Sequence, residues 1–569
     1  MKKRIWGIFG GISLLFYSTF LYSESLQIQT LGSKSIQSLI EKMTPQEKIG
    51  QLLMVGIHGK HMTSQTVHLI QELKIGGVIL YSENIGEPSQ VREFTGELQE
   101  LSSQVPLFIS IDQEGGSVAR LKTAVTVLPS AMALGAAGSS QFSFLAGKVT
   151  GHDLSSMGIN MNLAPVLDVL TEYENHLIGL RSFGDNPELV SQLGMWYVEG
   201  LQSSGVIATA KHFPGHGDTL EDSHYVIPVL NRDLAEIENF QLVPFQRAID
   251  NGLDAIMTAH ISIPSLDSSG LPATLSYNVL TNMVRKKMNF KGIVVTDDLE
   301  MKSILKRYDI GEASVKAILA GADVVMIGWT DQRKRVAYEA LLKAYQEGKI
   351  SEKRIRESLE RILTLKLKRG FFDLSRTPAE KSDEELSHPI HQKLADEIAA
   401  KAITLVQNSS EVLPLEQDDP RKVLLVTPLF NFYTQLKFFH ENVSPVFISV
   451  RPTVSELKEK ISDIVEKSSK YDLLIFGITH HSQIDFVKEV SEKVNIPIVA
   501  ISFGSPYYLK KFASLSSYLC SYGTQKELIS ATAKVLTGLV KPQGKLPVSL
   551  ENNLSSFKRR GMLKKVSVR

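Results

Sequence analysis

The chain has 569 residues, enough for about two domains if one is a large α/β barrel, or up to about four of average size. With 43% hydrophobic and 22% charged residues, its composition is that of a soluble globular protein and argues against long disorder and polytopic membrane insertion. The 62 Lys and Arg balance the 61 Asp and Glu, so no bulk positive charge recruits nucleic acid. The single cysteine, Cys520, excludes an internal disulfide and a cysteine-based zinc site.

The N-terminus has the pattern of a secretory signal peptide. Residues 1–23 combine a basic start, an apolar run and the small residue Ser23 at the end. We expect this segment to be removed, a linker to follow over residues 24–37, and the mature protein to be exported to the periplasm or beyond, without stable membrane insertion. The alternative is an uncleaved membrane anchor, since the bulky Leu21 lies three residues before the expected cleavage site.

The next part of the chain alternates short β-branched runs with amphipathic stretches, as in parallel strands joined by helices. A helix is expected to begin at Pro45, because Thr44 and Glu47 form a capping box around it. Eight runs are predicted as strands: residues 52–57, 76–81, 106–111, 161–167, 206–210, 253–258, 292–296 and 323–328. Eight such units predict a (β/α)8 TIM-type barrel over residues 38–372.

Ionisable residues follow the C-terminal ends of several predicted strands. They are Asp112, Asp168, the pair Lys211 and His212, His260 and Asp297. In a closed parallel barrel these strand ends share one rim, where barrel enzymes place their active sites. The sequence therefore predicts that side chains spread over nearly 200 positions converge on one cavity.

A second α/β domain is predicted after the barrel. A helix from Ser351 to about Lys368 closes the barrel, and the polar residues 373–389 are the expected linker. The following segment, 390–553, has strand-like runs at residues 423–426, 446–450, 473–476 and 498–502, with a helical stretch at 454–467. We expect a smaller sandwich with an open, mostly parallel sheet between helices, and then a basic tail over residues 554–569.

The densest group of chemically active residues follows the fifth predicted strand. Pro214 and two nearby glycines impose a loop, which leaves its ionisable side chains free to enter a rim cavity. In this loop Asp222 and His224 lie two positions apart, so the carboxylate is able to fix the imidazole tautomer and leave the other nitrogen to exchange a proton. Spacing alone is equally compatible with a surface pair that has no role.

Two further centres complete the predicted site. A hydrophobic strand delivers Asp297 to the rim, where an ionised carboxylate is able to attack an electrophilic carbon; Asp298 is expected to point away and orient the turn. Asp112 precedes paired glycines and offers an acceptor for vicinal hydroxyls, while Arg181 and the Lys211-His212 pair supply donors. Acceptors and donors around a neutral polyol predict a sugar site.

Together these segments resemble the family 3 glycoside hydrolases, and more narrowly their β-N-acetylglucosaminidase branch. The similarity spans roughly residues 38–370 through Asp112-Gln-Glu-Gly-Gly116, Arg181-Ser-Phe-Gly184, Lys211-His-Phe-Pro-Gly-His-Gly-Asp218, Asp222-Ser-His224 and Thr296-Asp-Asp-Leu-Glu-Met301. The C-terminal region, with Gly544-Lys-Leu-Pro547, is similar to the sandwich of two-domain members and is expected to support the barrel rather than to catalyse. One position departs from the family pattern, which commonly has Arg where this chain has Ser117.

The resemblance implies roles for individual residues. Asp297 would be the nucleophile, His224 the general acid/base and Asp222 its partner. The terminal N-acetylglucosamine would be held by Asp112, Arg181, Lys211 and His212, with Asp168 and Met301 near the same pocket. No metal or other cofactor is expected.

The function that follows is retaining hydrolysis of β-N-acetylglucosaminides from cell-wall fragments (muropeptides) or chitin-type oligosaccharides, through a covalent glycosyl-aspartate intermediate. A phosphorylase is an alternative, because a neutral imidazole repels phosphate less than a carboxylate does; a β-glucosidase of the same family is another. A metal-dependent barrel hydrolase with His212, His216, Asp218 and His224 as ligands is a third. A non-catalytic peptidoglycan-binding protein is disfavoured because Asp297 and His224 are both present.

Overall fold

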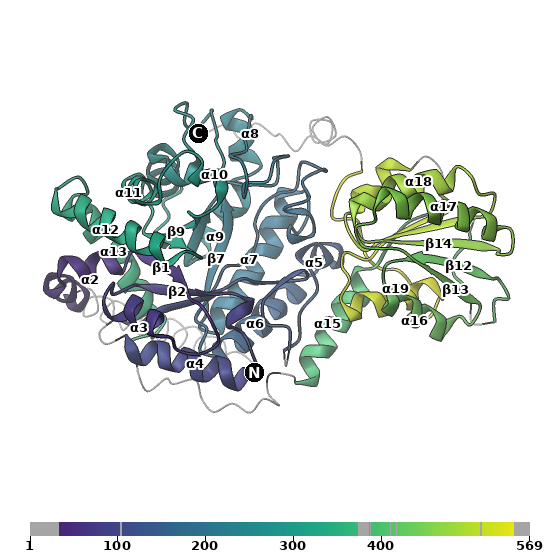
Figure 1. Cartoon of the computed structure of the whole chain (residues 1–569), viewed down its shortest axis with the longest axis horizontal. Helices are drawn as coiled ribbons and strands as arrows, with labels where there is room; N and C mark the ends of the chain where they lie inside the picture. The colour runs from purple at the N-terminus through teal and green to yellow at the C-terminus, as the bar shows by residue number, and fades with distance from the viewer. Residues whose placement is uncertain are drawn as a thin grey trace, which may run out of the picture.

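The computed structural model describes residues 34–102, 105–123, 125–373, 386, 388–409, 411–416, 418–512 and 515–550. These residues form a closed eight-stranded barrel followed by a second domain built on a six-stranded sheet (Figure 1). The predicted signal peptide, the basic tail and most of both predicted linkers lie outside the described residues. Among the helices that are described, none is long and apolar enough to span a membrane.

The barrel confirms the fold class predicted from the sequence. Its strands, in spatial order, are β1 (Leu53–Gly56), β10 (Val324–Ile327), β9 (Ile293–Asp298), β8 (Ala255–Thr258), β7 (Ile207–Phe213), β6 (Met161–Asn162), β3 (Phe108–Ile111) and β2 (Gly77–Leu80). Every neighbouring pair is parallel. The C-terminal ends of all eight strands therefore share one rim, as the alternating pattern predicted.

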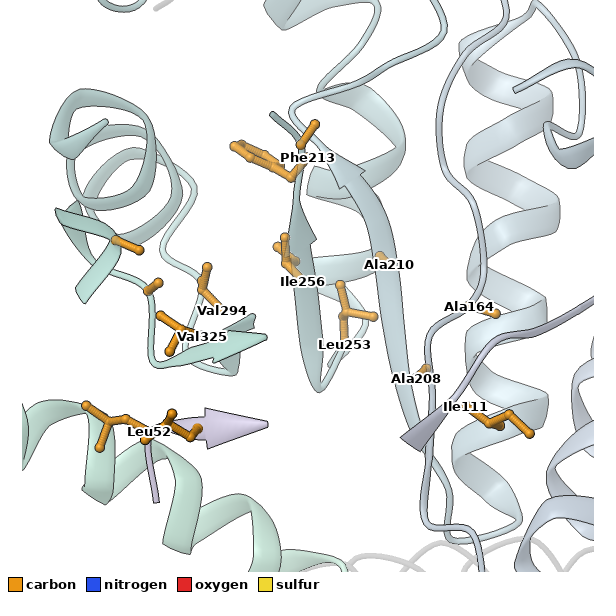
Figure 2. Close-up of a cluster of buried hydrophobic side chains, with 14 of the residues drawn as sticks. Leu52, Ile111, Ala164, Ala208, Ala210, Phe213, Leu253, Ile256, Val294 and Val325 are labelled. Carbon is orange, nitrogen blue, oxygen red and sulfur yellow. The ribbon is translucent and has the colours of Figure 1, made fainter. Parts of the chain in front are cut away.

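Side chains of the barrel strands alternate between two buried clusters, as the pleat requires. Met54, Met257 and Met326 belong to the cluster inside the barrel. Ile256 and Val294 belong to the larger cluster between the strands and the surrounding helices, part of which is shown in Figure 2. Both faces are buried, which explains why the strands read as continuous apolar runs.

The helix predicted to begin at Pro45 does so, and the helix that closes the barrel follows Ser351. Thr44 forms a capping box with Glu47 at the start of α2 (Pro45–Gly50), and Ser351 caps α13 (Glu352–Lys368). Further helices of this domain include α3 (Ser64–Gln71), α4 (Pro88–Leu101), α5 (Ala131–Ala137), α6 (Ser140–Ser156), α7 (Pro187–Ser203), α8 (Leu234–Asn239), α9 (Val243–Asp250), α10 (Lys302–Leu305), α11 (Ile310–Ala320) and α12 (Asp331–Gln346).

One predicted barrel strand is much shorter than expected. The run 161–167 forms a regular strand only at Met161–Asn162, and beyond it the pairing with β7 continues irregularly, as far as a bridge between Val166 and Lys211. Pro165 has no N–H to donate to a neighbouring strand, which contributes to this irregularity. The residues beyond it form a buried loop that carries Asp168.

The second domain has a mixed sheet in the order β11-β16-β15-β14-β12-β13. Its strands are β11 (Thr404–Asn408), β12 (Val423–Thr427), β13 (Val443–Phe447), β14 (Leu473–Ile478), β15 (Ile498–Ser502) and β16 (Ser517–Cys520). Its helices are α15 (Pro389–Ala402), α16 (Phe430–Phe439), α17 (Val454–Ser468), α18 (Ile484–Ser491) and α19 (Lys526–Leu536). The sheet is parallel except for β11, which runs antiparallel to β16.

The sequence located four of these six strands. The prediction of a strand at 446–450 was displaced, since β13 ends at Phe447. Strands β11 and β16 were missed because neither gives a long apolar run: β11 begins with Thr404 and ends in Gln407-Asn408, and β16 spans only Ser517–Cys520.

Candidate active site

A cavity of about 660 Å³ opens at the C-terminal rim of the barrel. Its lining includes the inward-facing apolar side chains Ile79, Leu163, Met257 and Met326, which also belong to or adjoin the barrel interior. The polar lining comes from loops after several strands, so the fold does bring distant segments to one place. Of the nine residues predicted for the site, eight line this cavity: Asp112, Arg181, Lys211, His212, Asp222, His224, Asp297 and Met301.

A network of opposite charges occupies one side of the cavity. Lys211 Nζ lies 2.7 Å from Asp112 Oδ1 and 2.7 Å from Glu114 Oε1. Arg181 donates to both oxygens of Glu114, from Nε at 2.9 Å and from a terminal nitrogen at 2.8 Å. Arg120 lies 3.4 Å from the other oxygen of Asp112. The network is a fixed set of charged donors and acceptors on a cavity wall.

The electrostatics of this network keep Glu114 and Lys211 ionised. Burial raises the pKa of Glu114, but Arg181 and Lys211 outweigh burial and hold that pKa well below its usual range. Burial lowers the pKa of Lys211, but Asp112 and Glu114 outweigh it, and the pKa lies above its ordinary value. These groups therefore carry their charges over the range in which most proteins are stable.

Asp168 is the one predicted substrate-binding residue that the structure places outside the cavity lining. Its fully buried carboxylate lies 2.8 Å from Nδ1 of His212 and accepts the backbone N–H groups of His212 and His216. Burial raises its pKa, but His212 and His216 outweigh that effect and lower it. Asp168 therefore orients His212 from beneath and shapes the loop, because a fully buried carboxylate has no direct path to a ligand in the cavity.

Asp297 lies at the end of β9 and accepts the backbone N–H of Asp298 at 2.8 Å. Burial raises its pKa, but His260, His212 and the Asp298 N–H outweigh burial and lower it, so the carboxylate is ionised. Asp298 orients the turn, as predicted, by accepting the N–H groups of Glu300 and Gly328, but it also lines the cavity. Burial raises the pKa of Asp298 to about 7. The two neighbouring carboxyls thus have opposite protonation preferences.

The Asp222–His224 pair lies on an exposed loop at the mouth of the cavity. Asp222 Oδ1 lies 2.7 Å from His224 Nδ1 and accepts the His224 backbone N–H at 2.8 Å. The imidazole is 56% exposed, so its Nε2 side is open to a ligand or water. With Nδ1 bound to a carboxylate, this geometry fits a residue that exchanges protons through Nε2.

Two contacts hold the loop that carries this pair. At its base, Arg232 binds Asp218 through two hydrogen bonds, at 2.5 and 3.1 Å. At its tip, the backbone oxygen of Tyr225 accepts from Lys306 Nζ at 2.9 Å, and Lys302 Nζ lies 5.4 Å from the Tyr225 ring centre. Both lysines lie in or next to α10, which follows Asp297, so the loop is joined to the segment that carries this carboxylate.

The metal-dependent alternative required its four ligands to converge, and they do not. Asp218 is paired with Arg232, His212 with Asp168, and His216 Nδ1 with the Thr219 hydroxyl. Within the described part of the chain, no three of the four proposed ligand residues bring ligand atoms within 4.8 Å of one another.

Sequence reasoning missed several residues of the cavity. Glu114 lies two positions after Asp112 in an extended segment, β4 (Gln113–Gly115), and this spacing places both carboxylates on the same side. Tyr81 and Trp329 follow β2 and β10, and their rings stack with centres 4.1 Å apart. Their positions at strand ends were the available signal, but an aromatic residue there is less distinctive than an ionisable one.

The departure at Ser117 leaves the loop around it ordered. Ser117 is exposed, and the side chain of Gln113 accepts from the backbone N–H groups of Arg120 and Leu121. These bonds close the β4–β5 hairpin without help from residue 117, β5 being Val118–Ala119.

The second domain supports a barrel loop next to the cavity. Asp185 donates its backbone N–H to the oxygen of Pro547 at 3.1 Å, and a side chain at Gly184 would clash with that oxygen, at 2.3 Å from its Cβ. Glu174 pairs with Lys511 at 3.0 Å. In the sequence, Arg181 lies between Glu174 and Gly184, so these contacts flank it on both sides. No described residue of the second domain lines the cavity itself.

Comparison with known proteins identifies the family. The chain matches the glycosyl hydrolase family 3 N-terminal domain over residues 44–365 and the family 3 C-terminal domain over residues 403–566. It is 32% identical over 552 residues to beta-hexosaminidase A of Pseudoalteromonas piscicida, with 85% of this chain and 90% of that protein covered. It is 25% identical over 559 residues to the beta-N-acetylglucosaminidase/beta-glucosidase of Cellulomonas fimi, with 91% and 96% covered.

A solved structure agrees with this match. The family 3 beta-N-acetylglucosaminidase from Paenibacillus sp. str. FPU-7 superposes with a TM-score of 0.81 at 36% identity, covering 89% of this chain and 99% of that one. The two family models match residues 44–365 and 403–566, and the alignment with the Pseudoalteromonas relative covers 85% of this chain. The chain is therefore a glycoside hydrolase and belongs to glycosyl hydrolase family 3.

Proposed function

We propose that this enzyme is a retaining exo-β-N-acetylglucosaminidase with Asp297 as nucleophile and His224 as general acid/base. The observation that carries the proposal is that an ionised Asp297 and the Asp222–His224 pair line the same cavity, from separate rim loops. The relatives named beta-hexosaminidase and beta-N-acetylglucosaminidase support the choice of substrate.

The proposed reaction has two steps at the anomeric carbon. Asp297 attacks this carbon and forms a glycosyl ester, while the Nε2 proton of His224 passes to the leaving oxygen. Water then gives a proton back to Nε2 and attacks the anomeric carbon, which releases the sugar and restores the Asp297 carboxylate. Asp222 binds Nδ1 at 2.7 Å in both steps and stabilises the imidazolium form.

The charge network is suited to hold the hydroxyls of a terminal sugar. Asp112 and Glu114 are acceptors and Arg181 and Lys211 are donors, all fixed by one another before a ligand arrives. Such preorganisation reduces the reorganisation needed in the transition state. The aromatic pair of Tyr81 and Trp329 adds an apolar surface on the same lining.

For the natural substrate we propose cell-wall (muropeptide) or chitin-type oligosaccharides. The support is the signal-like segment at residues 1–23, which favours an exported enzyme in the periplasm or outside the cell. The terminal N-acetylglucosamine of either substrate is neutral, consistent with a site whose charges are paired with one another.

A glycoside panel read by mass spectrometry tests the proposal. The enzyme is incubated with muropeptides, chitobiose and simple β-glucosides, each in phosphate and in a phosphate-free buffer. We expect free N-acetylglucosamine from the first two, at equal yield in both buffers. Sugar 1-phosphate formed only with phosphate would establish the phosphorylase instead, and preferential release of glucose would establish a β-glucosidase.

A further inference from the structure

A cluster of two imidazoles and a carboxylate lies between the two domains, away from the catalytic cavity. His152 and Asp153 come from α6 of the barrel, and His391 comes from α15 at the start of the second domain. The ligand atoms of the three residues all lie within 4.8 Å of one another. None of the three lines the cavity that holds Asp297 and His224.

The distances within this cluster match the separations between ligand atoms that share one metal ion, although the shorter of them is also within hydrogen-bonding range. Nδ1 of His152 lies 3.4 Å from Asp153 Oδ1, and Nδ1 of His391 lies 3.6 Å from the same oxygen. In a tetrahedral zinc site with bonds of about 2.0–2.1 Å, neighbouring ligand atoms are about 3.4 Å apart. The two imidazole planes are inclined by 73° with ring centres 5.7 Å apart, so the rings approach the carboxylate from different directions.

Burial leaves one atom of the cluster, Nδ1 of His391, with an unmet demand that a cation would satisfy. The side chains of Asp153 and His391 are only 6% and 10% exposed. His391 Nδ1 is buried and has no hydrogen-bond partner in the part of the chain that the structure describes. A buried polar atom without a partner costs about 1–3 kcal/mol. His152 is 34% exposed, which leaves room for water to complete the coordination.

We propose that His152, Asp153 and His391 form a structural site for a divalent transition metal of the zinc class, which joins the barrel to the second domain. Two neutral imidazoles and one carboxylate suit Zn²⁺ better than Mg²⁺ or Ca²⁺, which prefer oxygen ligands alone. Because the ligands come from α6 and α15, the ion binds only when the domains are docked. Binding therefore stabilises the docked protein by mass action.

Zinc titration of the full chain, after dialysis against a chelator, tests this proposal. Bound metal is counted by elemental analysis after gel filtration, and the melting temperature is followed with increasing ZnCl2. We expect about one zinc per chain and a rise in Tm of about 2–4 °C or more. The spectrum of the Co²⁺-loaded protein should show the strong visible bands of a tetrahedral site.

Variants assign the binding to this cluster. His391→Gln and Asp153→Asn should each weaken zinc binding at least about 10-fold and remove the Tm rise. His152→Gln, at the most exposed position, keeps the test valid if a buried variant does not fold. The matched control is His481→Gln, which breaks the other histidine contact between the domains, a stack of His176 on His481 with centres 4.4 Å apart, and should bind zinc as the unmodified chain does.

Two results would overturn the proposal. One is that the chain contains no zinc after gel filtration in micromolar ZnCl2 and that its Tm does not change when ZnCl2 is added. The other is equal zinc binding by the His391→Gln and unmodified proteins, which would place the metal elsewhere. Because the site is separate from the cavity, hydrolysis of a chromogenic glycoside at 25 °C should be the same with and without the metal. Failure of the proposed catalytic function would leave these binding results unaffected.

Discussion

Replacing Glu114 by Gln should impair both stability and catalysis, although sequence reasoning gave this residue no role. The Glu114 side chain is 6% exposed. Its carboxylate accepts two hydrogen bonds from Arg181 and forms an ion pair with Lys211. An amide keeps the shape but removes the charge, and turns an N–H group toward one of the two cations. Removing one partner from a buried ion pair costs about 3–5 kcal/mol.

Part of this loss should appear as a lower free energy of unfolding, measured in urea. Lys211 retains Asp112 as a partner, so we place the change in stability near the lower limit, at about 3 kcal/mol. Misplaced donors should also reduce kcat/KM by about 10²–10³-fold on an aryl N-acetylglucosaminide, which corresponds to about 3–4 kcal/mol. The matched control is Glu174→Gln, whose exposed pair with Lys511 should be worth less than about 1 kcal/mol, with unchanged activity. Wild-type stability and turnover in the Glu114→Gln variant would refute the importance of the charge network.

Three further changes test other parts of the structure. Asp222→Asn should lower kcat by about 10²-fold or more on a substrate with a poor leaving group, because departure of this group needs the His224 proton. The loss should be smaller on a substrate with an activated leaving group, which departs without that proton. Equal losses on the two substrates would contradict the acid role of His224. Asp298 has its pKa raised from 3.8 to about 7, so the folded state retains a proton that the unfolded chain releases. Its contribution to stability is therefore complete below about pH 4 and is lost as the pH rises to about 7. Relative to an Asp298→Asn variant, the unmodified protein should lose up to about 4 kcal/mol across this window in urea unfolding, and parallel pH curves would argue against the shift. Gly184→Ala should lower Tm by crowding the Pro547 oxygen, at an expected cost of about 1–3 kcal/mol, and an unchanged melting curve would show that the domains adjust freely.

The barrel was predictable because each strand is buried on both faces and reads as a short apolar run between helical stretches. Asp297 was placed at the cavity by topology, since parallel strands in a closed barrel share a rim, whereas His224 was placed there through its loop and the family resemblance. Their catalytic roles stay predictions until they are measured. The short regular part of β6 was not predictable from its apolar run, which continues through Pro165 to Leu167.

Other features depend on side-chain direction, which the sequence does not specify. Asp168 and Asp112 both follow barrel strands, yet one is fully buried under His212 and the other faces the cavity. The pairing of Glu114 with Arg181 joins positions 67 residues apart through two separate loops. Such contacts become visible only when the loops have been placed relative to one another.

The most direct test of the central claim is to trap the glycosyl-enzyme. A His224→Ala variant is mixed with an N-acetylglucosaminide that has a highly activated leaving group, and the protein is quenched and analysed by mass spectrometry with peptide mapping. Without the imidazole that activates water, the intermediate should accumulate, and the mass of one N-acetylglucosaminyl residue should be found on Asp297. Rapid turnover with no adduct, or an adduct on another carboxylate, would contradict the assignment of Asp297 as the nucleophile.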